Sequence, residues 1–431
     1  MSVQAMYRER RRDPAEAVRL VRDGDTIVVP IAAGEPPLLL QALSEQRRTF
    51  RDVTVFQLLP LRPAGYLDPE TTEHIRHNSA FLGGQSRSGV HEGWVDYCPA
   101  HFSEIPEMFR RGLLPSDVVF AHASEMDEHG FFSIGLSPDY TMAAIEQARA
   151  VVLEVNPQVP FCFGACHVHI SEVAALVESE QPVIELPPAP IGPVERAIAG
   201  HVGELVPDGA TLQIGIGGIP DAVIQQLASK RDLGVHTEMF GDGILSLLET
   251  GVVTNRRKNL HTGTTFATFA LGSHRLYEFM HRNPALQMYP VDVTNDPLLA
   301  GAHDNLHAIN GTLQVDLIGQ CGSESLGFRP YSGSGGQVDF VRAANRSRGG
   351  RSFLVLPSTA KNGTISRIRP TLTDGTQVTT GKNDVDHVVT EHGVAHLRGS
   401  TARQRARALI AIAHPDFRDE LTEAAERMRL L

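Results

Sequence analysis

A glycine-rich loop and a carboxylate follow one another near the middle of the chain. The loop is Gly215-Ile216-Gly217-Gly218-Ile219-Pro220, and the carboxylate is Glu238 in His236-Thr237-Glu238-Met239. Glycines let a ligand approach the main chain, and free N–H groups at a helix start attract negative charge. A carboxylate facing such donors could attack an acyl carbon while the donors hold the developing oxyanion. The two segments therefore suggest acyl transfer through a covalent glutamyl intermediate.

The same two segments also fit dinucleotide binding, in which a strand, a glycine loop and a helix precede an acidic residue that binds the ribose. Two details count against that reading. Pro220 stands where the dinucleotide fingerprint has its third glycine, and Glu238 is followed closely by the turn Gly241-Asp242-Gly243. A tight strand-to-helix turn without any ligand is the third interpretation of the loop.

An oxyanion donor is also available outside the loop. Attack of a carboxylate on a thioester passes through tetrahedral oxyanions, which need preorganised N–H or amide donors. Asn295 in Val293-Thr294-Asn295-Asp296 could supply a side-chain amide, or it could only cap the turn before Pro297. Because a carboxylate is a poor nucleophile in water, the binding energy of a large carrier such as coenzyme A must offset its desolvation.

The elements that must position these residues occur twice along the chain. Asp23–Val29 and Asp208–Ile214 each read as an Asp-Gly turn leading into a strand. Each strand is followed by a turn of small residues and proline, an apolar helix ending near Leu43 or Leu227, and a second strand. The duplication predicts two similar α/β domains with largely parallel sheets.

A proline-rich segment, Leu186–Pro193, predicts the boundary between the domains, because proline continues neither a helix nor a central strand. We therefore expect one α/β domain over residues 1–187 and a second over residues 188–431. In the register of the duplication Glu238 aligns with Leu58, so only the second domain carries the carboxylate.

Two further segments with glycine lie in the last third of the chain. Ser332–Phe340 contains Gly336 among other glycines, and we expect a turn or a close backbone approach there rather than a regular element. Val388-Val389 reads as a strand that leads into Thr390-Glu391-His392-Gly393. Thr401–Gln404 has the pattern of a capping box and predicts the start of a helix that is broken at Pro415.

Composition narrows the classes of function. The formal charge of −11 over 431 residues argues against nucleic acid or an anionic membrane as a partner. Four cysteines make no disulfide scaffold, and no apolar run approaches the ~18–20 residues of a membrane span. The arginine-rich start has no apolar stretch behind it, so no signal peptide is read and a cytoplasmic location is expected. Cys162, Cys166, His167 and His169 lack a second ligand pair at zinc-finger spacing, so no metal site is predicted.

Several segments along the chain together match the motifs of a known protein family, which is more specific than the glycine loop alone. The chain resembles the acetyl-CoA hydrolase/transferase family of class I CoA-transferases, and within it the 4-hydroxybutyrate CoA-transferase branch. The matching segments are Gly215–Pro220, His236–Met239, Asn255–Lys258, Ser332–Phe340, Leu356–Lys361, Val388–Gly399, Gly93–Tyr97 and Phe102–Pro106. The chain departs from the family pattern at Cys162–Ser171, where the family usually reads Gly-Asp-Ser before Ile-His-Val-Ser. We interpret this departure as a difference in the acyl pocket or in packing.

The resemblance implies roles for individual residues. It implies that Glu238 becomes a glutamyl-CoA thioester, with the N–H of Ile216 and the side chain of Asn295 near the oxyanion and Glu391 beside the reacting centre. It also implies a fold of two α/β domains with the active site in the cleft between them, in a homodimer or homotetramer. No cofactor is bound permanently, since coenzyme A and acyl-CoA are substrates. The residues implied to contact coenzyme A are Gly215, Ile216, Gly217, Gly218, Ile219, Gly336 and Lys361.

Some of these residues also have purely structural interpretations. Glu391 could be a buried acid that holds a strand end, and Lys361 a solvated loop cation. The function expected overall is ping-pong transfer of coenzyme A from a short-chain acyl-CoA (acetyl-, succinyl- or butyryl-type) to a small carboxylic acid such as 4-hydroxybutyrate. The alternatives are an acyl-CoA hydrolase, a succinyl-CoA:itaconate-type CoA-transferase, and a ligand-sensing module that performs no turnover.

Overall fold

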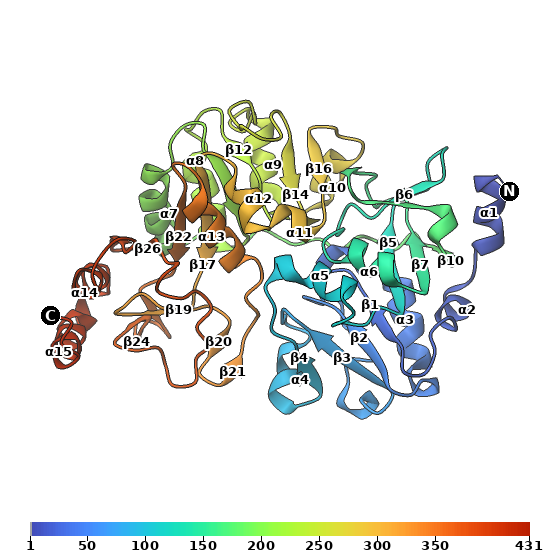
Figure 1. The fold of residues 1–431 in the computed structure, drawn as a ribbon, viewed down its shortest axis with the longest axis horizontal. Helices are drawn as coiled ribbons and strands as arrows, with labels where there is room; N and C mark the ends of the chain where they lie inside the picture. Colours follow the sequence, from blue (N-terminus) through green and yellow to red (C-terminus); the bar gives the residue numbers. More distant parts are fainter. Residues whose placement is uncertain (1) are drawn as a thin grey trace. The chain divides into compact units, whose positions relative to one another are not determined.

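The computed structural model describes residues 2–431, which fold into two compact units (Figure 1). The first unit contains the residues up to Leu186 together with Phe266–Thr294, and the second contains Pro187–Thr265 and Asn295–Leu431. Residues 266–294 therefore belong to the first unit, although the predicted domain over 188–431 includes them. None of the helices in residues 2–431 combines the length and the apolar character that a membrane span needs.

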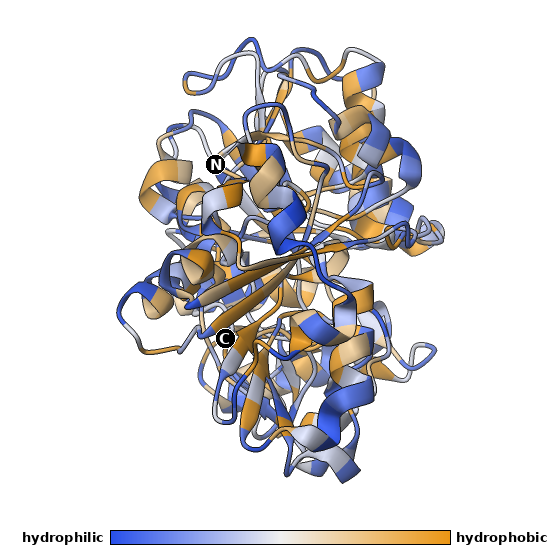
Figure 2. Cartoon of the chain, turned by 90° about the vertical axis from the view of Figure 1, so that its right-hand side faces the viewer, coloured by the Kyte–Doolittle hydropathy of each residue, from blue (hydrophilic) through white to orange (hydrophobic). Residues whose placement is uncertain are grey.

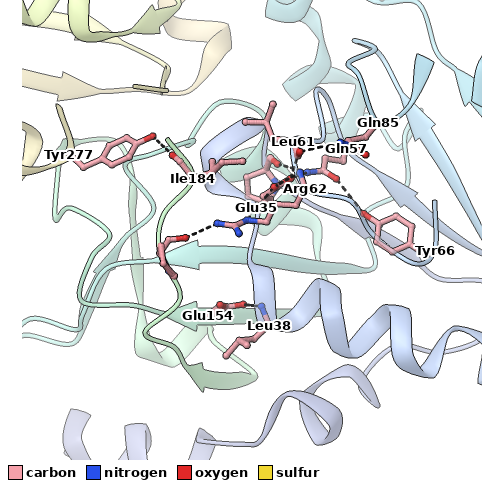
Figure 3. A network of polar contacts seen from close by, with 12 residues as sticks. Glu35, Leu38, Gln57, Leu61, Arg62, Tyr66, Gln85, Glu154, Ile184 and Tyr277 are labelled. Atoms are coloured by element: carbon pink, nitrogen blue, oxygen red, sulfur yellow. Dashed lines mark hydrogen bonds and ion pairs between the residues drawn. The ribbon is translucent and has the colours of Figure 1, made fainter. Parts of the chain in front are cut away.

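Specific contacts hold residues 266–294 in the first unit. Strand β16 (Leu286–Met288) pairs in parallel with β8 (Phe163–Gly164). The Tyr277 hydroxyl in α10 (His274–Met280) donates to the Ile184 carbonyl at 2.7 Å (Figure 3). These pairings join segments more than ninety positions apart, which is why the local sequence pattern does not reveal them.

The first unit is built on a seven-stranded sheet in the order β10-β7-β5-β1-β2-β3-β4, in which every neighbouring pair is parallel. Its strands are β1 (Thr26–Val28), β2 (Val53–Phe56), β3 (Ile75–Ser79), β4 (Val95–Tyr97), β5 (Val118–Ala123), β7 (Ala150–Val155) and β10 (Ala175–Glu178). Its helices are α1 (Val3–Arg10), α2 (Pro14–Val18), α3 (Pro37–Gln46), α4 (Arg87–Glu92), α5 (Ile105–Arg110), α6 (Thr141–Gln147), α10 and α11 (Val291–Thr294).

The second unit is built on a six-stranded sheet in the order β12-β11-β17-β22-β26-β27. Only the last strand of this sheet is antiparallel to its neighbour. The strands are β11 (Thr211–Ile214), β12 (Gly234–Val235), β17 (Leu306–Gly311), β22 (Arg351–Val355), β26 (His387–Thr390) and β27 (Gly393–His396). The helices are α7 (Pro193–Leu205), α8 (Gly218–Leu227), α9 (Asp242–Glu249), α12 (Pro297–Gly301), α13 (Gln337–Arg346), α14 (Ala402–Ala411) and α15 (Arg418–Arg427).

The strand orders confirm the prediction of two similar α/β domains with largely parallel sheets. Five strands of the first sheet, β10-β7-β5-β1-β2, have counterparts in the same spatial order in the second, β26-β22-β17-β11-β12. In each sheet, later strands lie on both sides of the unit's first strand, β1 or β11. The next strand, β2 or β12, lies on one side, and β5 or β17 lies on the other. The order of the strands therefore reverses at β1 and at β11. Ligands of open α/β sheets bind at the carboxyl ends of the strands at such a switch point.

The cores follow from strands that are buried on both faces. Every residue of β5, β7 and β11 is buried, as expected for parallel strands covered by helices on both sides. Figure 2 shows the strands as predominantly hydrophobic, whereas the helices carry hydrophilic residues on part of their surface. The capping box at Thr401 is confirmed, because its side chain accepts from the Gln404 N–H.

One expected irregular segment is partly helical. The prediction of a turn over Ser332–Phe340 is wrong from Gln337 onward, where α13 begins. The glycines end at Gly336, and Val338, Phe340 and Val341 then supply the buried face of a helix.

A buried polar network fixes the loops that follow β1 and β2 in the first unit (Figure 3). The Glu35 carboxylate accepts from the Arg62 N–H at 2.9 Å, the Leu61 N–H at 3.2 Å and the Gln57 amide at 3.0 Å. Arg62 in turn donates to the Pro182 carbonyl at 2.6 Å. Burial raises the pKa of Glu35, and the donors around it oppose that rise.

Replacement of Glu35 by Leu should destabilise the protein by about 2–4 kcal/mol, because one buried and two part-buried donors lose their acceptor. Chemical denaturation followed by circular dichroism measures the change. The exposed Glu73 on the same unit provides the control, and Glu73→Leu should stay within about 0.5 kcal/mol of the parent. Equal stability of the two variants would show that the network does not hold the loops.

Candidate active site

The glycine loop forms the connection from β11 to α8. Strand β11 ends at Ile214, α8 begins at Gly218, and Pro220 lies in the first turn of the helix. Gly217 has a φ of 116°, a conformation that side chains rarely adopt, so glycine is required there. The Ile216 side chain is 43% exposed. The loop therefore presents main-chain groups and one apolar side chain to the surface.

A cavity of about 460 Å³ adjoins the loop. Residues Gly215–Pro220 form one wall, while Asn310 and Gly311 at the end of β17 and Val355 at the end of β22 also line it. The cavity thus lies at the carboxyl ends of neighbouring strands, where this class of sheet binds ligands. It brings together Gly215, Ile216, Gly217, Gly218 and Ile219, the loop residues expected to contact coenzyme A.

Glu238 lies three residues after β12, the strand next to β11. The Asn295 side-chain amide donates to Glu238 Oε2 at 2.7 Å, and the Gly336 N–H donates to the same carboxylate. A Cβ atom added to Gly336 would lie 1.9 Å from Glu238 Oε2 and 2.3 Å from Asn295 Nδ2. Three segments far apart in the sequence therefore meet at one carboxylate, and glycine is the only residue that fits beside it.

The reading of Asn295 as a turn cap is wrong. Asp296 performs that task, since its side chain accepts from the N–H groups of Leu298 and Leu299 at the start of α12. Asn295 itself is fully buried and points its amide at Glu238. Its side chain is therefore available as a donor to the carboxylate or to an oxyanion formed there.

The surroundings of Glu238 shift its ionisation into the neutral range. Burial raises the pKa of this carboxyl to about 7, and the charge of Asp339 adds to the rise. The hydrogen bonds from Asn295 and Gly336 oppose the rise because they favour the charged form. A carboxylate in this setting is less solvated than one in water, so it is a stronger nucleophile.

Two residues that sequence reasoning did not place in the site hold β12, the strand that precedes Glu238. Asn255 Oδ1 accepts from the Val235 N–H at 2.8 Å, and Lys258 Nζ donates to the Val235 carbonyl at 2.9 Å. Strand β12 is at the edge of its sheet, so these groups of Val235 have no neighbouring strand on that side. The buried Lys258 also donates to the Thr264 carbonyl at 2.6 Å.

The segment that carries these two residues runs alongside the edge strand. The Leu233 N–H donates to the Val252 carbonyl, and the Thr254 and Asn255 N–H groups donate to the Leu233 carbonyl. Burial lowers the pKa of Lys258 to about 7. No local pattern signals this arrangement, because a lysine 23 positions after the end of a strand reads as an ordinary surface residue. Only the family resemblance singled out Asn255–Lys258.

Glu391 and Lys361 lie on other segments of the same unit. Glu391, in the turn between β26 and β27, accepts from the Ser358 N–H at 2.8 Å and from the Ser358 hydroxyl at 2.5 Å. Lys361 lies in the exposed turn between β23 (Thr359–Ala360) and β24 (Ile365–Ser366). Among residues 2–431, the two carboxylates accept from different donors. Glu391 accepts from Ser358, whereas Glu238 accepts from Asn295 and Gly336.

Comparison with known proteins adds to the geometry. Residues 1–187 match the acetyl-CoA hydrolase/transferase N-terminal domain and residues 272–425 match the C-terminal domain of the same family. The chain is 52% identical to succinyl-CoA:cyclohexane-1-carboxylate CoA transferase of Geobacter metallireducens, over 99% of this chain and 97% of that protein. It is 44% identical to 4-hydroxybutyrate coenzyme A transferase of Clostridium kluyveri, over 98% of each.

A solved structure agrees with these matches. RipA from Yersinia pestis is similar over the full length of both chains, with a TM-score of 0.95 and 40% sequence identity. The resemblance predicted from the sequence motifs is therefore confirmed at the level of the family and of the fold. The chain belongs to the acetyl-CoA hydrolase/transferase family.

Proposed function

We propose that this protein is a CoA-transferase that moves coenzyme A between an acyl-CoA and a carboxylic acid through a thioester on Glu238. The observation that carries the proposal is the buried Glu238 carboxylate, which accepts from Asn295 and Gly336 just after the strand next to β11. The names of the relatives support the transferase class. Acyl-CoA is a substrate in this proposal, and no cofactor is permanently bound.

The reaction begins with attack of a Glu238 oxygen on the acyl carbon of the thioester. The carbon–sulfur bond breaks, coenzyme A leaves as a thiolate, and a mixed anhydride joins the acyl group to Glu238. The thiolate then attacks the glutamyl carbonyl, which releases the acyl group as a carboxylate and leaves coenzyme A bound to Glu238 as a thioester. An acceptor carboxylate attacks this thioester, and the same steps in reverse yield the new acyl-CoA and free Glu238.

The residues around Glu238 have defined tasks in this sequence. Asn295 donates to the oxygen that becomes negative when the glutamyl carbonyl turns tetrahedral, and the Ile216 N–H is proposed to serve the acyl oxyanion. The cavity beside Gly215–Pro220 takes part of the coenzyme, with Gly336 and Lys361 as further contacts. Glu391 is proposed to lie near the acceptor, held in place by Ser358.

Trapping of the intermediate tests the proposal. The protein is incubated with succinyl-CoA and then with hydroxylamine, and its peptides are analysed by mass spectrometry. A hydroxamate on Glu238 is the expected result, because hydroxylamine cleaves the thioester. Turnover without modification of Glu238 would contradict the mechanism. Incubation of a Glu238→Ala variant provides the control for non-specific reaction.

The acceptor acid is proposed from the relatives and tested directly. Cyclohexane-1-carboxylate and 4-hydroxybutyrate are the first acids to compare, each with succinyl-CoA as donor, because relatives that use them cover almost the whole chain. Itaconate and acetate complete the series. Hydrolysis is the second candidate function, carried by the family description; thiol release at full rate without any acid would favour it.

The pH dependence of the first half-reaction should report Glu238. Only the carboxylate attacks, and its pKa is about 7, so kcat/KM for the acyl-CoA should rise with pH and level off above about pH 8. Below about pH 6 it should fall about tenfold per pH unit. Asn295→Ala removes a hydrogen bond that favours the charged form and should move the midpoint to higher pH. A pH–rate profile without this limb would contradict the assignment.

Lys258 is a positioning residue whose removal should lower kcat. Lys258→Met keeps the buried aliphatic stem but leaves the Val235 and Thr264 carbonyls without their donor, so Glu238 loses its fixed backbone. A drop in kcat of about tenfold or more is expected, with KM and the midpoint of the pH profile little changed. Arg256→Met, at an arginine that is 74% exposed on the same segment, is the matched control.

A further inference from the structure

Three side chains of the ligand type meet at the open end of the β26–β27 hairpin. His387 begins β26, His396 ends β27, and the two residues are directly opposite each other in the antiparallel register. Opposite residues of such a pair project from the same face, and the two imidazole ring centres are 4.6 Å apart. Asp386 immediately precedes β26 and joins the pair.

The distances within this group suit a transition metal ion. His387 Nδ1 is 2.9 Å from Asp386 Oδ2, and His396 Nε2 is 3.3 Å from Asp386 Oδ1. One ligand atom from each residue lies within 4.8 Å of the others. Ligand atoms at 2.0–2.2 Å from a tetrahedral zinc ion are separated by roughly 3.3–3.6 Å, so small side-chain movements bring all three into range. No other group of this kind occurs within residues 2–431.

The group is partly preorganised and partly open. Asp386 and His387 are buried, and the Ser352 N–H donates to Asp386 Oδ2 at 3.3 Å, which orients the carboxylate. The His396 side chain is 61% exposed, so its ring, now stacked at 20° to that of His387, is free to turn its nitrogen toward an ion. All three residues line a cavity of about 550 Å³, which gives a hydrated ion access.

The cavity around the three side chains is lined by charged residues of both signs. Arg351 and Arg398 line the same cavity, but so does Glu204. Arg351 directs one N–H to the Leu205 carbonyl at 3.2 Å, which orients part of its guanidinium toward the backbone. Two imidazoles and a carboxylate are a ligand set for zinc and related ions, with further positions left for water.

We propose that Asp386, His387 and His396 bind a divalent transition metal ion of the zinc class. The site lies at the opposite end of the hairpin from the turn that carries Glu391, and the ion would tie together the two strands that support this turn. Its role is therefore structural, and it acts on the hairpin rather than on the reacting groups. The site is independent of the transfer chemistry on Glu238.

The full chain, stripped with a chelator and dialysed, is titrated with Zn²⁺ by isothermal calorimetry and by thermal unfolding. Saturable binding at one ion per chain and a rise in Tm that the chelator reverses are expected. His396→Ala, an exposed position that should fold normally, should weaken binding by about tenfold or more. His129→Ala, at a side chain that is 75% exposed in the first unit, is the control and should bind as the parent does.

Two results would overturn the proposal. Absence of saturable zinc binding by the parent chain would mean that the three side chains form only a hydrogen-bonded group. Equal affinity of the parent and His396→Ala would place any bound zinc elsewhere. Asp386→Asn gives an independent check, because it removes the anionic ligand while keeping the shape of the side chain, and it too should weaken the affinity for zinc.

Discussion

Glu238→Gln should lower CoA transfer by about 10⁴-fold or more, because an amide oxygen cannot form and release the acyl anhydride on which the proposed mechanism depends. The substitution keeps the shape of the side chain and leaves an oxygen that can still accept from Asn295. Steady-state assays with succinyl-CoA and a carboxylic acid measure the loss. Glu426→Gln, at an exposed carboxylate on α15, is the matched control and should be fully active.

The loss of activity should not come from loss of folding. In the folded protein the pKa of Glu238 is raised to about 7, above its ordinary value. The protonated carboxyl therefore contributes its full stabilisation of the folded state at low pH, and this contribution is lost as the pH rises through about 7. At pH 8 the parent carries a buried charge that the glutamine variant lacks. The variant should therefore unfold at the same or a higher temperature. A variant with a lower Tm, or with more than about 1% of parental activity, would contradict the assignment.

Gly336→Ala should lower kcat by about 10²–10³-fold, which corresponds to about 3–4 kcal/mol of lost stabilisation in the transition state. The φ of Gly336 is −92°, which alanine adopts without strain, so the effect isolates the added methyl group. That group would lie 1.9 Å from Glu238 Oε2 and 2.3 Å from Asn295 Nδ2. The carboxylate must move, and its contact with Asn295 is broken.

Gly200→Ala separates this effect from a general response to alanine. Gly200 lies inside α7, and nothing occupies the space that its Cβ would take. The substitution should leave kcat unchanged and raise stability by about 0.5–1 kcal/mol, because alanine favours a helix interior more than glycine does. If Gly336→Ala retained the parental kcat, the close approach of Gly336 to the nucleophile would not matter for turnover.

Local patterns were sufficient for the elements that carry the glycine loop and Glu238. A short strand, glycines and an amphipathic helix occur within some twenty residues, so Thr211–Leu227 could be read directly. The repeated pattern also predicted two similar α/β domains with largely parallel sheets, whereas the order of the strands came only from the structure. The unequal alignment of Glu238 with Leu58 then pointed to the one domain that holds the carboxylate.

Long-range pairings could not be predicted in the same way. Asn295 lies 57 positions from Glu238, and its contact depends on how α12 begins. The roles of Asn255 and Lys258 depend on which strand forms the edge of the sheet, a property of the whole topology. The helical start at Gln337 was missed because glycines just before it dominate the local composition.

The hydrogen bonds that join Asn255 and Lys258 to Val235 also bear on the tendency of the protein to aggregate. An exposed edge strand is a template on which another chain can add a strand and begin to aggregate. At Val235 the outward N–H is bonded to Asn255 and the outward carbonyl to Lys258. An incoming strand would have to displace the buried Lys258 side chain at that point. We therefore expect the two side chains that position Glu238 also to hinder the addition of a strand from another chain at this edge of the sheet.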